Sequence, residues 1–431
     1  MEKLLTTSHS KLRELVFVVL LAFSASDQSK ADEPTYELDG HIKARTLADS
    51  FPDDSVFKDL IGSTAFDVET DLRLNFSADK DAWSFDAAWQ LYAGHGDRIE
   101  LSRLLPANGM SFGESTPSDD RRLMNLTDMI SDDGSFRALH RLDRLSVGYA
   151  SENVVLRLGR QAISWGNGLM FSPMDIVNPF DPTTVDTEYK VGDDMAYGQF
   201  LFADGNDLQI AHVFRRSVLT GDPDSNLTTS AVKYHGIRGD SEFDLLIARS
   251  YDEMTVGLGG NRNVGGAVWR GDIVVSDTDI GSKVQLVTNL SYSWVLGGKN
   301  MSGVVEYYFN GFGQRSDRYD PAFLVQNPNL LIRLERGEMF TLGRNYLAGG
   351  VLIEMNPLWI LTPNLFSNLD DGSALFQVTT RYSLGDNSEF LAALNVPLGP
   401  SGTEFGGISA SQGGLYFSTD LSLFAQFAWY F

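Results

Sequence analysis

The stretch LSLFAQFAWYF, residues 421–431, ends the chain, and its apolar and polar side chains alternate. As a β-strand it would present two distinct faces, because successive side chains of a strand point to opposite sides. One face would hold Leu421, Leu423, Ala425, Phe427, Trp429 and Phe431, and the other Ser422, Gln426 and Tyr430, with Phe424 as the exception. An ordered aromatic end needs an apolar environment. The stretch therefore predicts a strand with one face against an apolar layer.

The same period of two runs through most of the remaining sequence. In FDVETDLRLNFSA, residues 66–78, the apolar Phe66, Val68 and Leu72 alternate with charged residues that belong beside water. No stretch combines a sustained helical period with a start and a stop signal. The pattern predicts an all-β protein.

The predicted connections between strands alternate between short and long. Short turns are expected at 79–81, 151–153, 204–206, 238–240, 297–300 and 355–357, and long connections at 93–141, 161–192, 217–229 and 312–344. This asymmetry is typical of outer-membrane β-barrels, with short periplasmic turns and long extracellular loops. A weak strand near 254–260, turning at 261–263, gives the even strand count that such barrels have. We expect residues 32–431 to form a single transmembrane antiparallel β-barrel of about 18 strands, with 16 as the alternative.

The first 31 residues have the pattern of a signal peptide. Lys3, Lys11 and Arg13 precede the apolar run LVFVVLLAF, residues 15–23, and small residues follow for cleavage near Ala25 or Ala31. The run is shorter than the ~20 residues that a transmembrane helix needs. We therefore expect export to the outer membrane.

Composition excludes several classes of protein. The formal charge of −23 argues against a nucleic-acid partner, and the absence of cysteine excludes disulfides and cysteine-based metal sites. Acidic residues gather in two predicted loops, where oxygen ligands could hold Ca²⁺ or Mg²⁺, although a solvated negative surface is the simpler interpretation. They are Asp119, Asp120, Asp128, Asp132, Asp133, Asp181, Asp186, Glu188, Asp193 and Asp194. No other cofactor is expected.

Two stretches resemble known families. The alternating end with Phe427, Trp429 and Phe431 is similar to the recognition signal of bacterial outer-membrane proteins, which implies that the barrel-assembly machinery reads it. The stretch LRLGRQAISWGNGLMFSPMDIVNPFDP, residues 156–182, resembles a segment of porin-like families near the alginate-export and substrate-selective porins. The resemblance implies a Gram-negative outer-membrane barrel in contact with membrane lipid and lipopolysaccharide.

The loop that follows this strand is rich in glycine, proline and apolar side chains, which suits an ordered segment. It either folds into the barrel as a constriction or covers the external mouth. The candidate constriction residues are Arg160, Trp165, Gly166, Asn167, Gly168, Phe171, Asp175 and Asn178. Ser164 lies in a near match to a nucleophile elbow, but the first glycine and the helix are missing, so an enzyme is not expected.

The predicted inward faces carry both signs of charge. The candidate pore-lining residues are Lys43, Arg45, Asp67, Glu69, Asp71, Arg73, Asp86, Arg157, Arg249, Arg270, Asp272, Glu306 and Arg381. Arg157 and Arg160, next to the ordered loop, suggest a site for an anionic substrate. A barrel of this size can hold an aqueous channel, so the expected function is passive diffusion of ions or small hydrophilic solutes. The alternatives are an outer-membrane enzyme or lipid-modifying barrel, and a non-conducting barrel for polymer export or surface anchoring.

Overall fold

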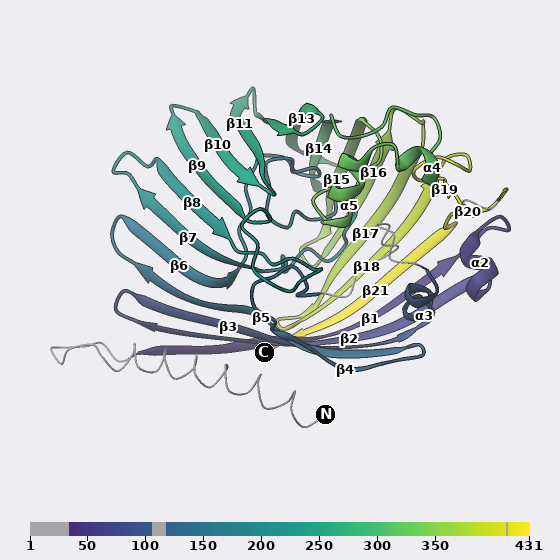
Figure 1. Ribbon diagram of the computed structural model, residues 1–431, viewed down its shortest axis with the longest axis horizontal. Coiled ribbons are helices and arrows are strands. Elements are labelled where there is room, and N and C mark those ends of the chain that lie inside the picture. Colours follow the sequence, from purple (N-terminus) through teal and green to yellow (C-terminus); the bar gives the residue numbers. More distant parts are fainter. Residues whose placement is uncertain (1–33, 106–117, 411–412) are drawn as a thin grey trace.

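The computed structural model describes residues 34–105, 118–410 and 413–431, most of them in one closed antiparallel sheet (Figure 1). The predicted signal peptide and part of the predicted loop 93–141 lie outside these residues. The barrel strands are β1 (Thr35–Ser50), β2 (Thr64–Lys80), β3 (Trp83–Gly96), β5 (Phe136–Ala150), β6 (Val154–Gln161), β7 (Asp193–Leu201), β8 (Asp207–Val213), β9 (Thr229–Arg238), β10 (Ser241–Ser250), β11 (Glu253–Val264), β12 (Ala267–Thr278), β13 (Gly281–Leu296), β14 (Lys299–Asn310), β15 (Asn345–Asn356), β16 (Trp359–Asn368), β17 (Ala374–Gly385), β18 (Ser388–Leu398) and β21 (Leu421–Tyr430).

The last strand closes the barrel against the first. In the described residues β1 pairs with both β2 and β21, so that Ile42 lies between Leu72 and Trp429. One further strand, β4 (Thr127–Asp133), pairs only with β5. Eighteen strands therefore form the closed wall, which confirms the predicted fold and strand count. Closure leaves no unpaired sheet edge in a solvent that cannot hydrogen-bond to it.

The weak strand expected near 254–260 is present as β11, but its turn lies further along the chain than predicted. β11 continues to Val264, and the turn is formed by Gly265 and Gly266 with φ of 57° and 89°. Such left-handed angles are accessible to glycine at little cost. The predicted turn at 261–263 was wrong, because the two consecutive glycines adopt the left-handed turn angles at a lower cost than asparagine does.

The two faces of the wall differ in chemistry. Outward-facing side chains such as Leu158, Ile247 and Trp429 are exposed in the protein alone and form the apolar surface that lipid would cover. Inward-facing side chains alternate with them and include the buried Lys43 and Glu306. The polar face therefore lines the lumen.

The two ends of the barrel also differ. The end where β1 begins and β21 ends carries short turns, and the other end carries the long connections together with the short turns at 251–252 and 279–280. The long connections carry the short elements α2 (Val56–Ile61), α3 (Asp97–Leu104), α4 (Pro321–Leu324), α5 (Pro328–Glu335), β19 (Ile408–Ser409) and β20 (Tyr416–Phe417). We refer to this end as the loop end.

The four short helices are absent from the sequence prediction. Each is at most eight residues long, so none gives a sustained helical period. Local signals start three of them: Ser55, Asp320 and Asn327 accept backbone hydrogen bonds as N-caps. No helix in the described part of the chain has the length and apolar character to span a bilayer.

Candidate functional site

Residues 162–192, which connect β6 to β7, fold into the barrel; we call them the inner loop (Figure 1). Trp165 Nε1 donates a hydrogen bond of 2.7 Å to Gln209 Oε1 on the inward face of β8. The side chain of Asn167 donates to Asp244 Oδ2 on β10 at 3.1 Å and to Asp272 Oδ1 on β12 at 2.8 Å. Of the two arrangements compatible with the sequence, the structure has the one inside the lumen.

Glu306 on β14 holds the middle of the inner loop. Its carboxylate accepts three consecutive backbone N–H groups, from Leu169 at 2.7 Å, Met170 at 3.0 Å and Phe171 at 2.6 Å. Asn289 on β13 donates to the same carboxylate at 3.0 Å and to the carbonyl oxygen of Asn167 at 3.1 Å. Glu306 is fully buried, so one wall residue satisfies loop donors that would otherwise be buried without partners.

Apolar contacts complete the docking of the inner loop. The ring of Phe171 stacks on Tyr308 of β14, with ring centres 4.8 Å apart and planes 12° from parallel. Trp165 and Met174 lie in a second cluster with inward residues of β7–β10 and β12. Gly168 allows the sharp bend between them, because a Cβ there would lie 1.8 Å from the carbonyl oxygen of Phe171. The first half of the loop is therefore packed like a protein core.

The second half of the inner loop crosses the lumen to the opposite wall. Gln377 on β17 donates to the carbonyl oxygen of Thr183 at 2.8 Å. Asp186 then pairs with Lys43 and Arg45 of β1 at 2.7 and 3.0 Å. We call residues 183–190 the crossing segment. Because the loop contacts both walls, it narrows the lumen.

Ionic contacts secure the crossing segment at both ends. Glu188 pairs with Lys43 at 2.7 Å and accepts a hydrogen bond from Tyr430. Lys190 returns to the first half of the loop, where it pairs with Asp175 at 2.6 Å. The inner loop is thus closed on itself as well as tied to the wall.

A group of arginines lies where the inner loop rejoins the wall. Arg73, Arg141 and Arg144 all pair with Asp143, the first at 2.9 Å and the last at 2.6 Å. The guanidinium of Arg73 also lies 4.1 Å from the ring centre of Tyr189 in the crossing segment. One carboxylate faces three guanidinium groups, so the local charge is positive.

Most of the predicted pore-lining residues lie on inward faces. Strand register places Lys43, Arg45, Asp67, Glu69, Asp71, Arg73, Asp86, Arg157, Arg270, Asp272, Glu306 and Arg381 there. The structure brings Lys43, Arg45, Asp272 and Glu306 into contact with the inner loop, together with the predicted loop residues Asn167 and Phe171. The role of these residues in permeation stays a prediction.

Arg249 does not face the lumen, contrary to the sequence prediction. It alternates with the inward Ala248 and Ser250, shares a face with the exposed Ile247, and pairs with Asp252 in the following turn. β10 is short, and its alternation is obscured by two adjacent leucines, so the sequence left its faces poorly defined.

Arg160 also differs from the expectation. It shares a face with Leu156 and Leu158, which face outward, yet it is fully buried. Its guanidinium pairs with Asp119 and Asp194, both at 2.8 Å. Burial alone would raise the pKa of Asp119, but Arg160 and Arg122 outweigh it and lower this pKa. Arg160 therefore fastens the segment before β4 to the wall, which leaves only Arg157 of the predicted anionic site on the lumen side.

Sequence reasoning missed the neutral side chains that hold the inner loop. Gln209, Asn289 and Gln377 each make a direct contact with the loop. Their inward position follows from strand alternation. The pattern of charged residues, however, did not indicate that uncharged amide side chains would bind the inner loop.

Some of the acidic residues that were predicted to lie in long connections pair with basic side chains. Asp132 pairs with Arg103 and Arg137, Asp186 with Lys43, and Asp193 with Arg215. In the described ranges, no group of three or more His, Cys, Asp or Glu side chains is placed to hold a metal ion. These pairs give no support to the Ca²⁺ or Mg²⁺ hypothesis.

The ion pairs of Asp186 predict a response to acid. Burial would raise the pKa of Asp186, but the charges and hydrogen bonds of Lys43 and Arg45 lower it to about 2. Because the pKa of Asp186 is lowered, its ion pairs stabilise the docked loop fully above about pH 4. This stabilisation is lost as the pH falls towards 2. We expect the conductance of the unaltered protein to become larger and noisier below pH 4. In Asp186→Asn we expect the same larger and noisier conductance already at pH 7.

Single-channel recording between pH 7 and pH 2 measures this effect. Asp204, in an exposed turn with only local hydrogen bonds to Asn206, provides the control Asp204→Asn, which should behave like the unaltered protein. An Asp186→Asn channel that keeps the original conductance at pH 7 would show that the crossing segment is held without this pair.

Comparison with known proteins gives matches in structure only. No protein-family model and no curated protein sequence matches the chain. OccAB1 of Acinetobacter baumannii superposes with a TM-score of 0.52 at 10% identity, covering 94% of this chain and 99% of that chain. OccAB4 of the same organism gives 0.51 at 8%, covering 94% and 100%, and OccK5 (OpdH) of Pseudomonas aeruginosa gives 0.51 at 9%, covering 91% and 98%. At these identities the likeness is one of fold, that of a large closed antiparallel β-barrel.

Proposed function

We propose that the protein is an outer-membrane channel through which ions or small hydrophilic solutes diffuse, and that the inner loop is its constriction. The observation that carries this proposal is the docking of the loop inside a closed barrel of eighteen strands, through Asn167, Glu306 and Asp186. A barrel of this size has an aqueous lumen unless it is filled. A loop tied to opposite walls narrows that lumen and makes passage selective.

The charge beside the crossing segment supports a local preference for anions. Arg73, Arg141 and Arg144 share one carboxylate, and two buried nitrogen atoms of Arg141, Nε and Nη1, have no hydrogen-bond partner among the described residues. Arg157 lies further along the same wall, with its guanidinium 4.9 Å from the ring centre of Tyr197. Uncompensated positive charge at a constriction attracts anions and repels cations.

Single-channel recording of the refolded protein in a planar bilayer tests the proposal. We expect discrete current steps, and under a salt gradient a reversal potential that reports the ion preference. Arg157→Ala should shift this potential towards cation preference, because it removes a positive charge from the lumen. Arg249→Ala, which alters an outward arginine, is the matched control and should leave the potential unchanged.

A β-rich sample that inserts into the bilayer and gives no current steps would contradict the channel proposal. Equal shifts in the Arg157 and Arg249 variants would contradict the local role of Arg157 alone.

A further inference from the structure

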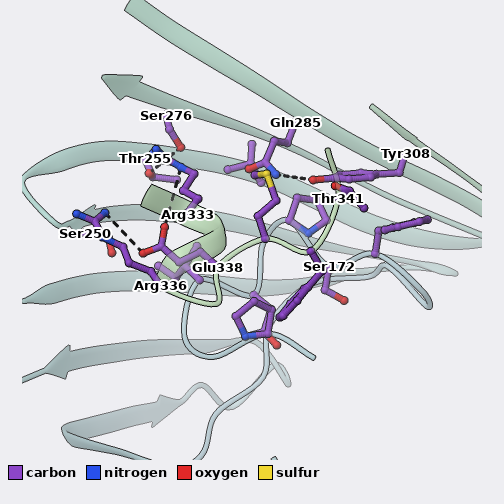
Figure 2. A pocket seen from close by; sticks show the side chains of 18 of the residues that line it. Ser172, Ser250, Thr255, Ser276, Gln285, Tyr308, Arg333, Arg336, Glu338 and Thr341 are labelled. Carbon is purple, nitrogen blue, oxygen red and sulfur yellow. Dashed lines mark hydrogen bonds and ion pairs between the residues drawn. The ribbon is translucent and has the colours of Figure 1, made fainter. Parts of the chain in front are cut away.

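A cavity of about 90 Å³ lies between the inner loop and the connection from β14 to β15, on the loop-end side of the constriction (Figure 2). Its wall is formed by inward residues at the loop ends of β10–β14, and its roof by α5 and the residues that follow it. Since one water occupies on the order of 10–15 Å³ by this measure, the cavity holds roughly six to nine waters. That is room for one small solute.

One side of the cavity is lined with hydroxyl and amide groups. Thr255 Oγ1 and Ser276 Oγ lie 3.0 Å apart on neighbouring strands, and both point into the cavity (Figure 2). Gln285 donates to the hydroxyl of Tyr308 at 2.6 Å on the same wall. A hydroxyl can donate one hydrogen bond and accept two, so these groups keep capacity for a ligand after bonding to each other.

The opposite side is apolar. It includes the prolines Pro173, Pro179 and Pro182 of the inner loop. The prolines limit the motion of this side, because their φ angles are restrained. An apolar surface of the cavity therefore faces a surface of hydroxyl and amide groups.

The charged residues at the cavity are paired with one another. Arg333 pairs with Glu253 and, at 4.0 Å, with Glu338, and Arg336 lies 3.8 Å from the same Glu338. Asp175, the remaining acid of the lining, pairs with Lys190. Each charged side chain of the described lining lies within 4.0 Å of an opposite charge, so the cavity offers little to a charged ligand.

From these three features we infer that the cavity is a binding site for a small neutral polyhydroxylated solute on its way into the channel. Such a molecule has hydroxyls for the Thr255–Ser276 wall and a less polar face of C–H groups for the prolines of the inner loop. A site of this kind places convergent polar groups beside an apolar surface, as small-molecule sites commonly do. The inference rests on the proposed channel function and adds the class of solute.

Current blockade measures binding in the working channel. With glucose added at the loop end of the inserted channel, we expect a saturable reduction of ion current. Gluconate has a similar set of hydroxyls and adds a carboxylate, and we expect it to require a higher concentration for half-blockade. In Thr255→Val/Ser276→Ala the half-blocking glucose concentration should rise roughly ten- to thirty-fold, since about two hydrogen bonds are lost. Removing both hydroxyls together leaves neither without its partner, so the barrel should fold normally.

Thr362→Val is the matched control: Thr362 shares the inward face of β16 with Asn364 and Phe366 but does not line the cavity. The half-blocking glucose concentration of this variant should equal that of the unaltered protein. Three results would each overturn the inference: gluconate blocks the current more strongly than glucose, the double variant keeps the original half-blocking glucose concentration, or Thr362→Val weakens the blockade as much as the double variant does.

Calorimetric titration of the detergent-solubilised protein with glucose separates the two proposals. If the unaltered protein gives no conductance but binds glucose with a heat that the double variant lacks, the binding site is supported and the channel proposal is contradicted. Conductance without glucose binding would refute the site and retain the channel.

Discussion

Replacing Glu306 by glutamine is expected to release the inner loop and to enlarge the conductance of the barrel more than any other single substitution in the lumen. Oε1 of Glu306 accepts the N–H groups of Met170 and Phe171, and Oε2 accepts those of Leu169 and Asn289. Glutamine has one acceptor oxygen and presents an NH₂ group to the other pair of donors. Two hydrogen bonds are therefore lost and replaced by opposed donors.

The size of the effect follows from the charge of the acceptor. A hydrogen bond to a charged group contributes about 1.5–3 kcal/mol, so the loss of two destabilises the docked loop by about 3–6 kcal/mol. Each 1.4 kcal/mol is about a tenfold change in an equilibrium constant, which gives a change on the order of 10²–10⁴ in the ratio of docked to undocked loop. The aromatic stack of Phe171 on Tyr308 remains and limits the change towards the lower end.

Single-channel recording distinguishes a released loop from a damaged barrel. The Glu306→Gln channel should show larger steps with frequent transitions between levels, while heat-modifiable migration on gels shows that the barrel is intact. Glu354→Gln is the matched control, because Glu354 on β15 bonds to Asn300 and does not contact the inner loop. Unaltered steps in Glu306→Gln would mean that apolar packing alone holds the loop.

Strand alternation made the barrel predictable from the sequence. Along long strands such as β1 and β2, apolar and charged side chains mostly alternate, and the position of Lys43 and Asp71 on the inward face follows directly. The closing strand could be identified because its outward residues Phe427 and Trp429 are aromatic. The prediction was weakest where strands are short, as at Arg249.

The docking of the inner loop could not be read from the sequence. Its proline, glycine and apolar content indicates an ordered segment but gives no partner, because the contacts of Asn167 and Asp186 join residues far apart in the chain. Arg160 shows the same limit. It directly precedes the loop, yet its carboxylate partners come from the connection before β4 and from β7, and alternation turns it away from the lumen.

Arg160→Met is expected to destabilise the wall between β5 and β8 rather than to alter permeation. The guanidinium is fully buried and donates to Asp119, to Asp194 and to the carbonyl oxygen of Met124. Removing one partner from a buried ionic group leaves uncompensated charge and costs about 3–5 kcal/mol. Urea unfolding in detergent should show this loss, and limited proteolysis should find cleavage near residues 118–126.

Arg381→Met supplies the contrast, because Arg381 is half exposed and lies 3.4 Å from Glu389. Exposed pairs contribute about 0–1 kcal/mol, so this variant should unfold almost like the unaltered protein. The double variant Arg160→Met/Asp194→Asn removes one acid together with the base and leaves Asp119 paired with Arg122, so it should recover most of the lost stability. If the double variant is no more stable than Arg160→Met, the packing of the arginine side chain and not its charge secures this part of the wall.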